Sequence, residues 1–144
     1  MLIRLIVPGE YARLEDLNAS LETVLQRHGI EPQVRGDVRL IVEELASNAI
    51  DHGGDVPPSG HHELSVDIAI AGGLLKLEFR DTGAPFDPTR VPDPRLDADI
   101  EQRPLGGLGV YLIRNLAHDI GYRRDGAYNV LSVSLRTPHA EVAE

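Results

Sequence analysis

The chain has 144 residues, of which 42% are hydrophobic and 26% charged, values that fit one globular domain with its own core. Its formal net charge of −9 argues against DNA or RNA as the main ligand, because binding to phosphates needs a basic surface. No apolar run reaches the roughly 18 residues of a transmembrane helix, so no membrane span is expected, and the absence of cysteine fits a cytoplasmic protein.

The first half of the chain is predicted to be a strand followed by two helices. Residues 1–7 are predicted to form a short strand. Apolar residues then recur at helical spacing over residues 12–28, and Gly29 is placed to end this helix. A second amphipathic helix is predicted from residue 32 or 34 to residue 51.

The pattern changes to alternation in the next segment. Apolar residues occupy every second position over residues 64–70 and again over 75–79, with Gly72-Gly73 between them as a hairpin signal. Residues 82–105 contain five prolines and no sustained periodicity, so they are predicted to form a long loop. Loops of this length in a compact domain usually serve a function.

The remaining residues are predicted to form a helix over 107–118 and two strands, over 119–124 and 129–135. The order of elements predicts an α+β fold: a two-layer sandwich in which helices cover one face of a mixed, mostly antiparallel sheet. The predicted domain comprises residues 1–136, and residues 137–144 form a C-terminal tail.

Three polar constellations stand out from this framework, and the first is in "VEELASNAIDHG". Glu44 and Asn48 are four residues apart, so they lie about 40° apart around the helix and next to its apolar stripe. Taken alone, the pair is better explained as an ordinary solvated helix edge. In a site, the carboxylate can accept a proton and the amide oxygen can ligate Mg²⁺.

The second constellation is "DTGAPF", directly after a predicted strand. Asp81 and Gly83 suit an ordinary turn. Such a motif after a strand is most often just a turn, and the functional alternative is a pocket in which the Asp81 carboxylate accepts a hydrogen bond from an exocyclic amino group such as that of adenine. Gly83 would then allow the backbone to approach the base.

The third constellation is "PLGGLGVYLIRNL", in which glycines lead into a helix. Free N–H groups at a helix start bind anions, and glycine permits a close phosphate, although a flexible loop end is a fair alternative. A P-loop is excluded, because the single lysine, Lys76, is not in a P-loop motif.

In their order along the chain, these motifs resemble those of the GHKL (Bergerat-fold) ATPase superfamily. The compact form looks most like the bacterial anti-sigma-factor serine/threonine kinases, and the resemblance covers roughly residues 1–136. It implies an ATP-dependent kinase, with ATP and Mg²⁺ as cofactors, that phosphorylates an anti-sigma-factor antagonist and sequesters a sigma factor. It also allows a homodimer. A binding switch without phosphoryl transfer and a histidine kinase catalytic domain are the alternatives.

The resemblance assigns a role to each motif residue. Glu44 would be the general base and Asn48 the Mg²⁺ ligand, with His52 near the nucleotide. Glu43 is the neighbouring carboxylate, but it lies about 100° round the helix. The residues expected to bind adenine are Asp81, Gly83 and Phe86. Those expected around the phosphates are Gly106, Gly107, Leu108 and Gly109.

Two further features follow from the same resemblance. Residues 87–105 would be a lid over ATP, with three arginines that could reach phosphate: Arg90, Arg95 and Arg103. The family often has a threonine near adenine on its last strand. This chain has no threonine there, which leaves Asn129 or Ser132 as the substitute.

His61-His62 is expected to be a pair of exposed loop residues, since a third metal ligand at suitable spacing is missing.

Overall fold

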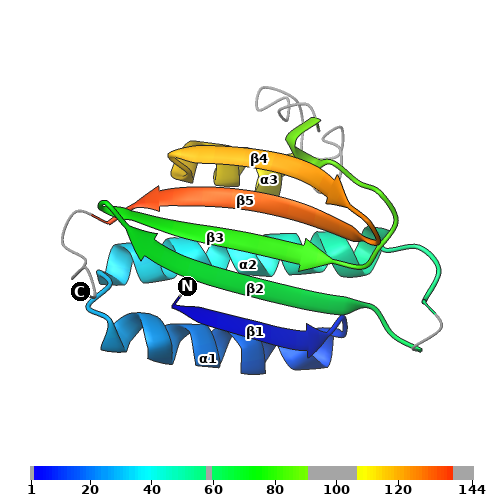
Figure 1. Cartoon of the computed structure of the whole chain (residues 1–144), viewed down its shortest axis with the longest axis horizontal. Helices are drawn as coiled ribbons and strands as arrows, with labels where there is room; N and C mark the ends of the chain where they lie inside the picture. The colour runs from blue at the N-terminus through cyan, green and yellow to red at the C-terminus, as the bar shows by residue number, and fades with distance from the viewer. Residues whose placement is uncertain (1, 58–59, 91–106, 138–144) are drawn as a thin grey trace.

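A five-stranded antiparallel sheet forms one layer of the computed structural model, which describes residues 2–57, 60–90 and 107–137 (Figure 1). Neighbouring strands follow the order β1-β2-β3-β5-β4, so the last hairpin adds to the sheet beside β3. All four strand pairings are antiparallel. The strands are β1 (Ile3–Pro8), β2 (Glu63–Ala71), β3 (Leu74–Asp81), β4 (Asp119–Asp125) and β5 (Tyr128–Arg136).

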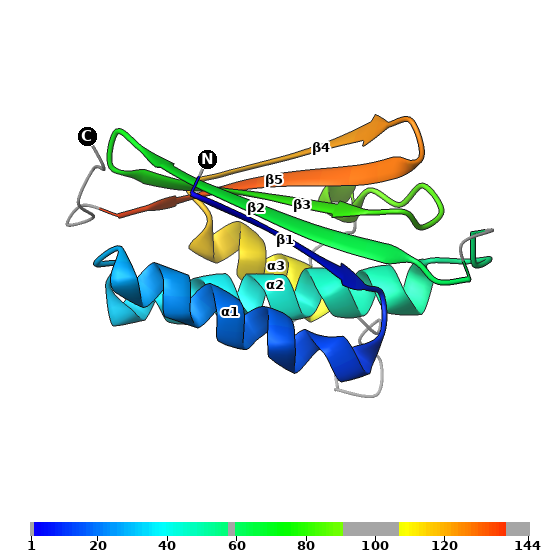
Figure 2. The same cartoon turned by 60° about the horizontal axis from the view of Figure 1, so that its bottom comes forward.

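The three described helices lie together on one face of this sheet (Figure 2). They are α1 (Leu14–Arg27), α2 (Pro32–His52) and α3 (Gly107–Leu116). This arrangement confirms the predicted α+β sandwich, since each helix covers the sheet with its apolar stripe. No helix in the described ranges is both long and apolar enough to cross a bilayer.

The core lies between the helices and the three central strands. Ile68, Leu77 and Val133 are paired in register across β2, β3 and β5, and none is more than 1% exposed. Ile41 of α2 is completely buried in the same cluster. Because side chains alternate along a strand, the neighbouring residues of these strands face away from the helices.

The element boundaries lie within two residues of those predicted, and most differ by one or two. Helix α3 ends at Leu116 instead of residue 118, because the His118 N–H already pairs with the Ser134 carbonyl in the sheet, at 2.7 Å. Thr137 is the first residue of the predicted C-terminal tail. It is 2% exposed, and its N–H donates to the Gly73 carbonyl at 2.8 Å. Residues 138–144 lie outside the described ranges.

The end of α1 is set by Gly29, as predicted. Its φ of +72° lies in the left-handed region, and its N–H donates to the Gln26 carbonyl at 3.2 Å. The N–H of the buried Ile30 donates to the Leu25 carbonyl at 3.1 Å, which completes a Schellman motif.

We expect Gly29→Ala to lower the free energy of unfolding by about 1 kcal/mol, because only glycine adopts a positive φ without strain. Gly36→Ala is the matched control: Gly36 lies within α2, and an added Cβ would meet nothing within 4 Å at either position. Gly36→Ala should raise the free energy of unfolding by about 0.5 to 1 kcal/mol, because alanine is more favourable than glycine inside a helix. Urea unfolding of both variants checks this. Equal changes of the same sign would contradict the capping role of Gly29.

Candidate active site

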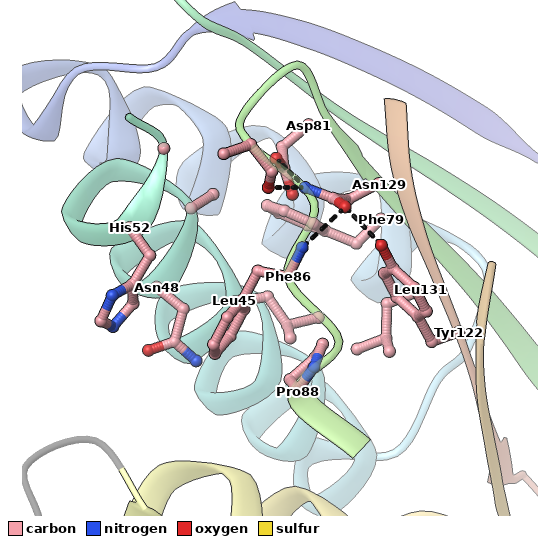
Figure 3. A pocket seen from close by; sticks show the side chains of 13 residues that line it. Leu45, Asn48, His52, Phe79, Asp81, Phe86, Pro88, Tyr122, Asn129 and Leu131 are labelled. Atoms are coloured by element: carbon pink, nitrogen blue, oxygen red, sulfur yellow. Dashed lines mark hydrogen bonds between the residues drawn. The ribbon is translucent and has the colours of Figure 1, made fainter. Parts of the chain in front are cut away.

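A pocket opens between α2 and the C-terminal end of β3, at the place where β4 and β5 complete the sheet (Figure 3). It brings together four of the side chains predicted for the site: Asn48, His52, Asp81 and Phe86. The rings of His52 and Phe86 are stacked, with centroids 5.0 Å apart and planes inclined by 16°. The other walls are mainly apolar and include Leu45, Ala49, Phe79, Tyr122 and Leu131.

Asn129 forms the polar floor of this pocket and is only 6% exposed. Its Nδ2 donates to Asp81 Oδ1 at 3.0 Å and to the Ala84 carbonyl at 2.8 Å. Its Oδ1 accepts from the Phe86 N–H at 3.2 Å and from the Tyr122 hydroxyl at 2.6 Å (Figure 3). The four bonds use both donors and both acceptors of the amide.

The two candidates for the last-strand residue lie on opposite faces of the sheet. Asn129 lies in the pocket, whereas Ser132 lines a depression on the opposite face of the sheet with Lys76 and Glu78. The alternation of side chains along β5 indicates this difference. Asn129 is two residues from the buried Leu131 and shares its face of the sheet, whereas Ser132 is one residue away and lies on the other face. Tyr122 was missed altogether, since nothing local marks it as a partner of Asn129.

The loop that follows β3, residues 81–86, is called the Asp81 loop below. It lies directly against the C-terminal end of α2: the Ala84 N–H donates to the Gly53 carbonyl at 2.9 Å. A Cβ at Gly83 would be 2.9 Å from the Gly53 Cα, so the two backbones touch where only glycine fits. Gly83 also donates its N–H to Asp81 Oδ1 at 2.9 Å, which fixes the carboxylate.

Glu44 lies on the side of α2 that faces α3. A Cβ added at Gly109 would overlap the Glu44 carboxylate, so the glycine lets the two helices approach at this point. The neighbouring Glu43 points elsewhere: its Oε1 accepts from Arg39 Nε at 3.1 Å and from Asn18 Nδ2 at 3.3 Å. The acid motif and one glycine of the phosphate motif therefore meet in space.

Asn48 lies one helical turn after Glu44, on the wall of the pocket. Its Nδ2 is buried and has no hydrogen-bond partner among the described residues. A buried amide nitrogen without an acceptor is unusual in a folded protein and suits a donor that meets a ligand. In the described part of the chain, no group of three or more acidic, histidine or cysteine side chains could hold a metal by itself.

Several predicted site residues fall outside the described ranges. These are Gly106 and most of the lid, with Arg95 and Arg103, and the side chain of Leu108. Gly107 is the first residue of α3, as the phosphate motif requires. Of the lid, Pro88–Arg90 form a 3-10 turn, and Arg114 of α3 donates to the Thr89 carbonyl. Arg90 is exposed and pairs with Asp87, with Nε and Oδ2 3.4 Å apart.

A tyrosine connects the N-terminal segment to the same stretch of α2. The Tyr11 hydroxyl donates to Asp51 Oδ1, three residues beyond Asn48. This hydrogen bond to a carboxylate raises the pKa of Tyr11 above its ordinary value, because it stabilises the protonated phenol. The turn after β1 is thereby connected to the helix that carries Glu44 and Asn48.

The sequence matches the histidine kinase-like ATPase domain family over residues 7–135. The serine-protein kinase RsbW of Listeria monocytogenes is 28% identical to this chain over 133 residues, which cover 90% of the chain and 82% of the relative. The serine/threonine-protein kinase BtrW of Bordetella bronchiseptica is 25% identical over 114 residues, which cover 79% of each protein. Both relatives carry the names of protein kinases.

Solved structures share the same fold. The crystal structure of the RsbU and RsbW domains of a Mycobacterium tuberculosis protein aligns with 93% of this chain and 32% of that longer chain, with a TM-score of 0.62 and 16% identity. The SiaB-SiaC complex of Pseudomonas aeruginosa aligns with 93% of this chain and 89% of that chain, with a TM-score of 0.56 and 14% identity. At these identities the likeness concerns the fold.

We expect Asn129→Ala to lower the free energy of unfolding by about 3 kcal/mol, because it leaves several buried polar groups without partners. Ser132→Ala, on the same strand but the opposite face, should change it by less than about 0.5 kcal/mol. Chemical unfolding of the two variants measures the difference. Similar losses in both would show that the Asn129 network contributes little.

Proposed function

Because this chain belongs to the histidine kinase-like ATPase family, we propose that it binds ATP between α2 and the Asp81 loop and phosphorylates a protein hydroxyl. The observation that carries this proposal is the close contact between Glu44 and Gly109. It unites a candidate base with the start of a helix suited to phosphate. Separate, distant positions for these two motifs would have left no common site for a triphosphate.

The adenine base would be recognised by Asp81. Both described hydrogen bonds to its carboxylate, from Gly83 N–H and Asn129 Nδ2, end on Oδ1. The other oxygen, Oδ2, retains the capacity to accept from an exocyclic amino group. Asn129 has no bonding capacity left for the base, so its part is to orient Asp81. The apolar walls of the pocket and the His52–Phe86 stack suit a flat purine.

Asn48 fits the role of a magnesium ligand through its amide oxygen, since its side chain is on the pocket wall. The buried, unpartnered Nδ2 atom is a donor and would instead serve an acceptor on the nucleotide. Magnesium takes few protein ligands and completes its shell with phosphate oxygens and water, in keeping with the lack of an acidic cluster in the described residues. When bound, the ion neutralises negative charge on the phosphates of ATP. Gly107 and Gly109 would allow the phosphates to approach the start of α3.

Glu44 would act as the general base in phosphoryl transfer. The hydroxyl oxygen of a serine or threonine forms a bond to the γ-phosphorus, the bond to the β-phosphate oxygen breaks, and ADP leaves. The hydroxyl proton passes to the Glu44 carboxylate. Glu43 is already paired with Arg39 and Asn18, so it is the weaker candidate for this step.

The protein substrate and partner belong to the same proposal. The relatives RsbW and BtrW are named serine or serine/threonine kinases, which supports a serine or threonine as the acceptor. We assign the acceptor to an anti-sigma-factor antagonist and propose that the chain also sequesters a sigma factor, in one domain of residues 1–136. A switch that binds ATP without phosphoryl transfer would have the same nucleotide contacts, so the experiment with Glu44 decides between the two.

Asp81→Ala should abolish base recognition. The unmodified protein should bind ATP about 10- to 100-fold more tightly than purine riboside triphosphate, which lacks the 6-amino group, because a carboxylate would lose its charged hydrogen bond. The variant should bind both nucleotides with equal, weak affinity. Isothermal titration calorimetry with Mg²⁺ measures the ratio. If the variant keeps its preference for ATP, Asp81 is not the residue that reads the base.

Glu44→Ala should retain ATP binding and lower the rate of phosphoryl transfer by roughly 10²- to 10⁴-fold, the range for loss of a general base. Glu43→Ala, the adjacent acid, should transfer at close to the normal rate. The measurement uses labelled ATP, Mg²⁺ and candidate antagonist proteins from the same genome, followed by detection of phosphoserine or phosphothreonine. Normal transfer by Glu44→Ala refutes the assigned base. ATP binding with no label on any partner from the unmodified protein favours the switch.

A further inference from the structure

His62 lies immediately before β2, between the end of α2 and the Asp81 loop. It was expected to be exposed together with His61, but only His61 is exposed, and His62 is half-buried. Its ring makes two contacts with different segments. The Nδ1 atom is 3.3 Å from Thr82 Oγ1, and the Nε2 atom is 3.3 Å from the Gly54 carbonyl oxygen.

One arrangement of protons on the ring satisfies both contacts. The Gly54 carbonyl can only accept, so Nε2 carries the hydrogen and donates it. The Thr82 hydroxyl oxygen already accepts the Glu63 N–H at 2.9 Å, and it can donate its own proton to Nδ1. The ring thus has a partner at each nitrogen.

The surrounding backbone is shaped to admit this ring. A Cβ at Gly53 would be 3.1 Å from the ring Nε2, and one at Gly9 would be 3.0 Å from the His62 Cβ. The Gly9 N–H donates to the His62 carbonyl at 2.6 Å, which holds the residue at the end of β1. Gly54 has a φ of +71°, a conformation in which the chain turns away after α2.

These contacts join the same two segments as the candidate site. Thr82 lies between Asp81 and Gly83, and Gly54 follows the residue that accepts the Ala84 N–H. We propose that His62 is a positioning residue that holds the Asp81 loop against the end of α2, and so fixes Asp81 relative to Asn48. This inference rests on the proposed function where it concerns nucleotide affinity. The contact itself is independent of any ligand.

Three variants test the role of His62. His62→Ala removes both contacts. His62→Gln places a side-chain amide near the position of Nε2, so it retains a donor for the Gly54 carbonyl. His61→Ala changes the exposed neighbour and is the matched control. Affinities for ATP and for purine riboside triphosphate with Mg²⁺ are measured for each, together with the midpoint of thermal unfolding.

For His62→Ala we expect ATP affinity to fall about 3- to 10-fold, the effect of losing one or two ordinary hydrogen bonds. The preference for ATP over purine riboside triphosphate should fall by a similar factor, because Asp81 is no longer held at the base. His62→Gln should return both values to within about 2-fold of the original, and His61→Ala should leave them unchanged. A lower unfolding midpoint with an unchanged nucleotide preference would overturn the positioning role, as would unchanged affinity.

A second measurement uses the ligand-free protein. The Ala84 amide, bonded to Gly53, should exchange its hydrogen faster in His62→Ala than in His61→Ala when followed by NMR. Equal exchange would refute the contact between loop and helix that the inference requires. If the unmodified protein binds no ATP, the proposed function fails, and the Ala84 exchange rate still decides whether His62 holds the loop.

Discussion

The contact between the end of α2 and the Asp81 loop is the constraint on which the candidate site depends. Gly53 and Gly83 approach so closely that a side chain on Gly83 would collide with backbone, and the Ala84 N–H pairs with the Gly53 carbonyl. One segment is the end of a helix and the other the end of a strand, from opposite layers of the sandwich (Figure 2). Their contact sets the distance between the residues assigned to magnesium and those assigned to the base.

The buried amide of Asn129 holds the other side of the same loop. A polar side chain beside the core would cost free energy if it lacked partners, but here every donor and acceptor is used. Such a network permits one arrangement of the loop, since any displacement breaks several bonds at once. Arg124 of β4 adds a further bond, from Nη1 to the Gly83 carbonyl at 2.8 Å. The Asp81 loop is therefore held from the helix side and from the sheet side.

Helix α2 serves the core and the candidate site at the same time. Its buried stripe, with Ile41 and Leu45, packs on the sheet, and the adjoining strip presents Glu44 and Asn48. A rigid helix is a precise support for reacting groups, because its backbone cannot shift without movement of the core. Phosphoryl transfer depends mainly on positioning and charge stabilisation, so this dual use of α2 suits the proposed reaction.

The sequence alone determined the elements and the fold class, because hydrophobic periodicity and glycine positions such as Gly29 and Gly72-Gly73 act locally. It also predicted the preference for Glu44 over Glu43, which follows from helix geometry. The roles of individual site residues remain assignments from resemblance. The partners of Asn129, the Gly53–Gly83 contact and the place of His62 were decided only in the tertiary structure. Each joins segments far apart in the chain, and the order of the strands in the sheet and the packing of helices on it, which no local pattern encodes, bring those segments together.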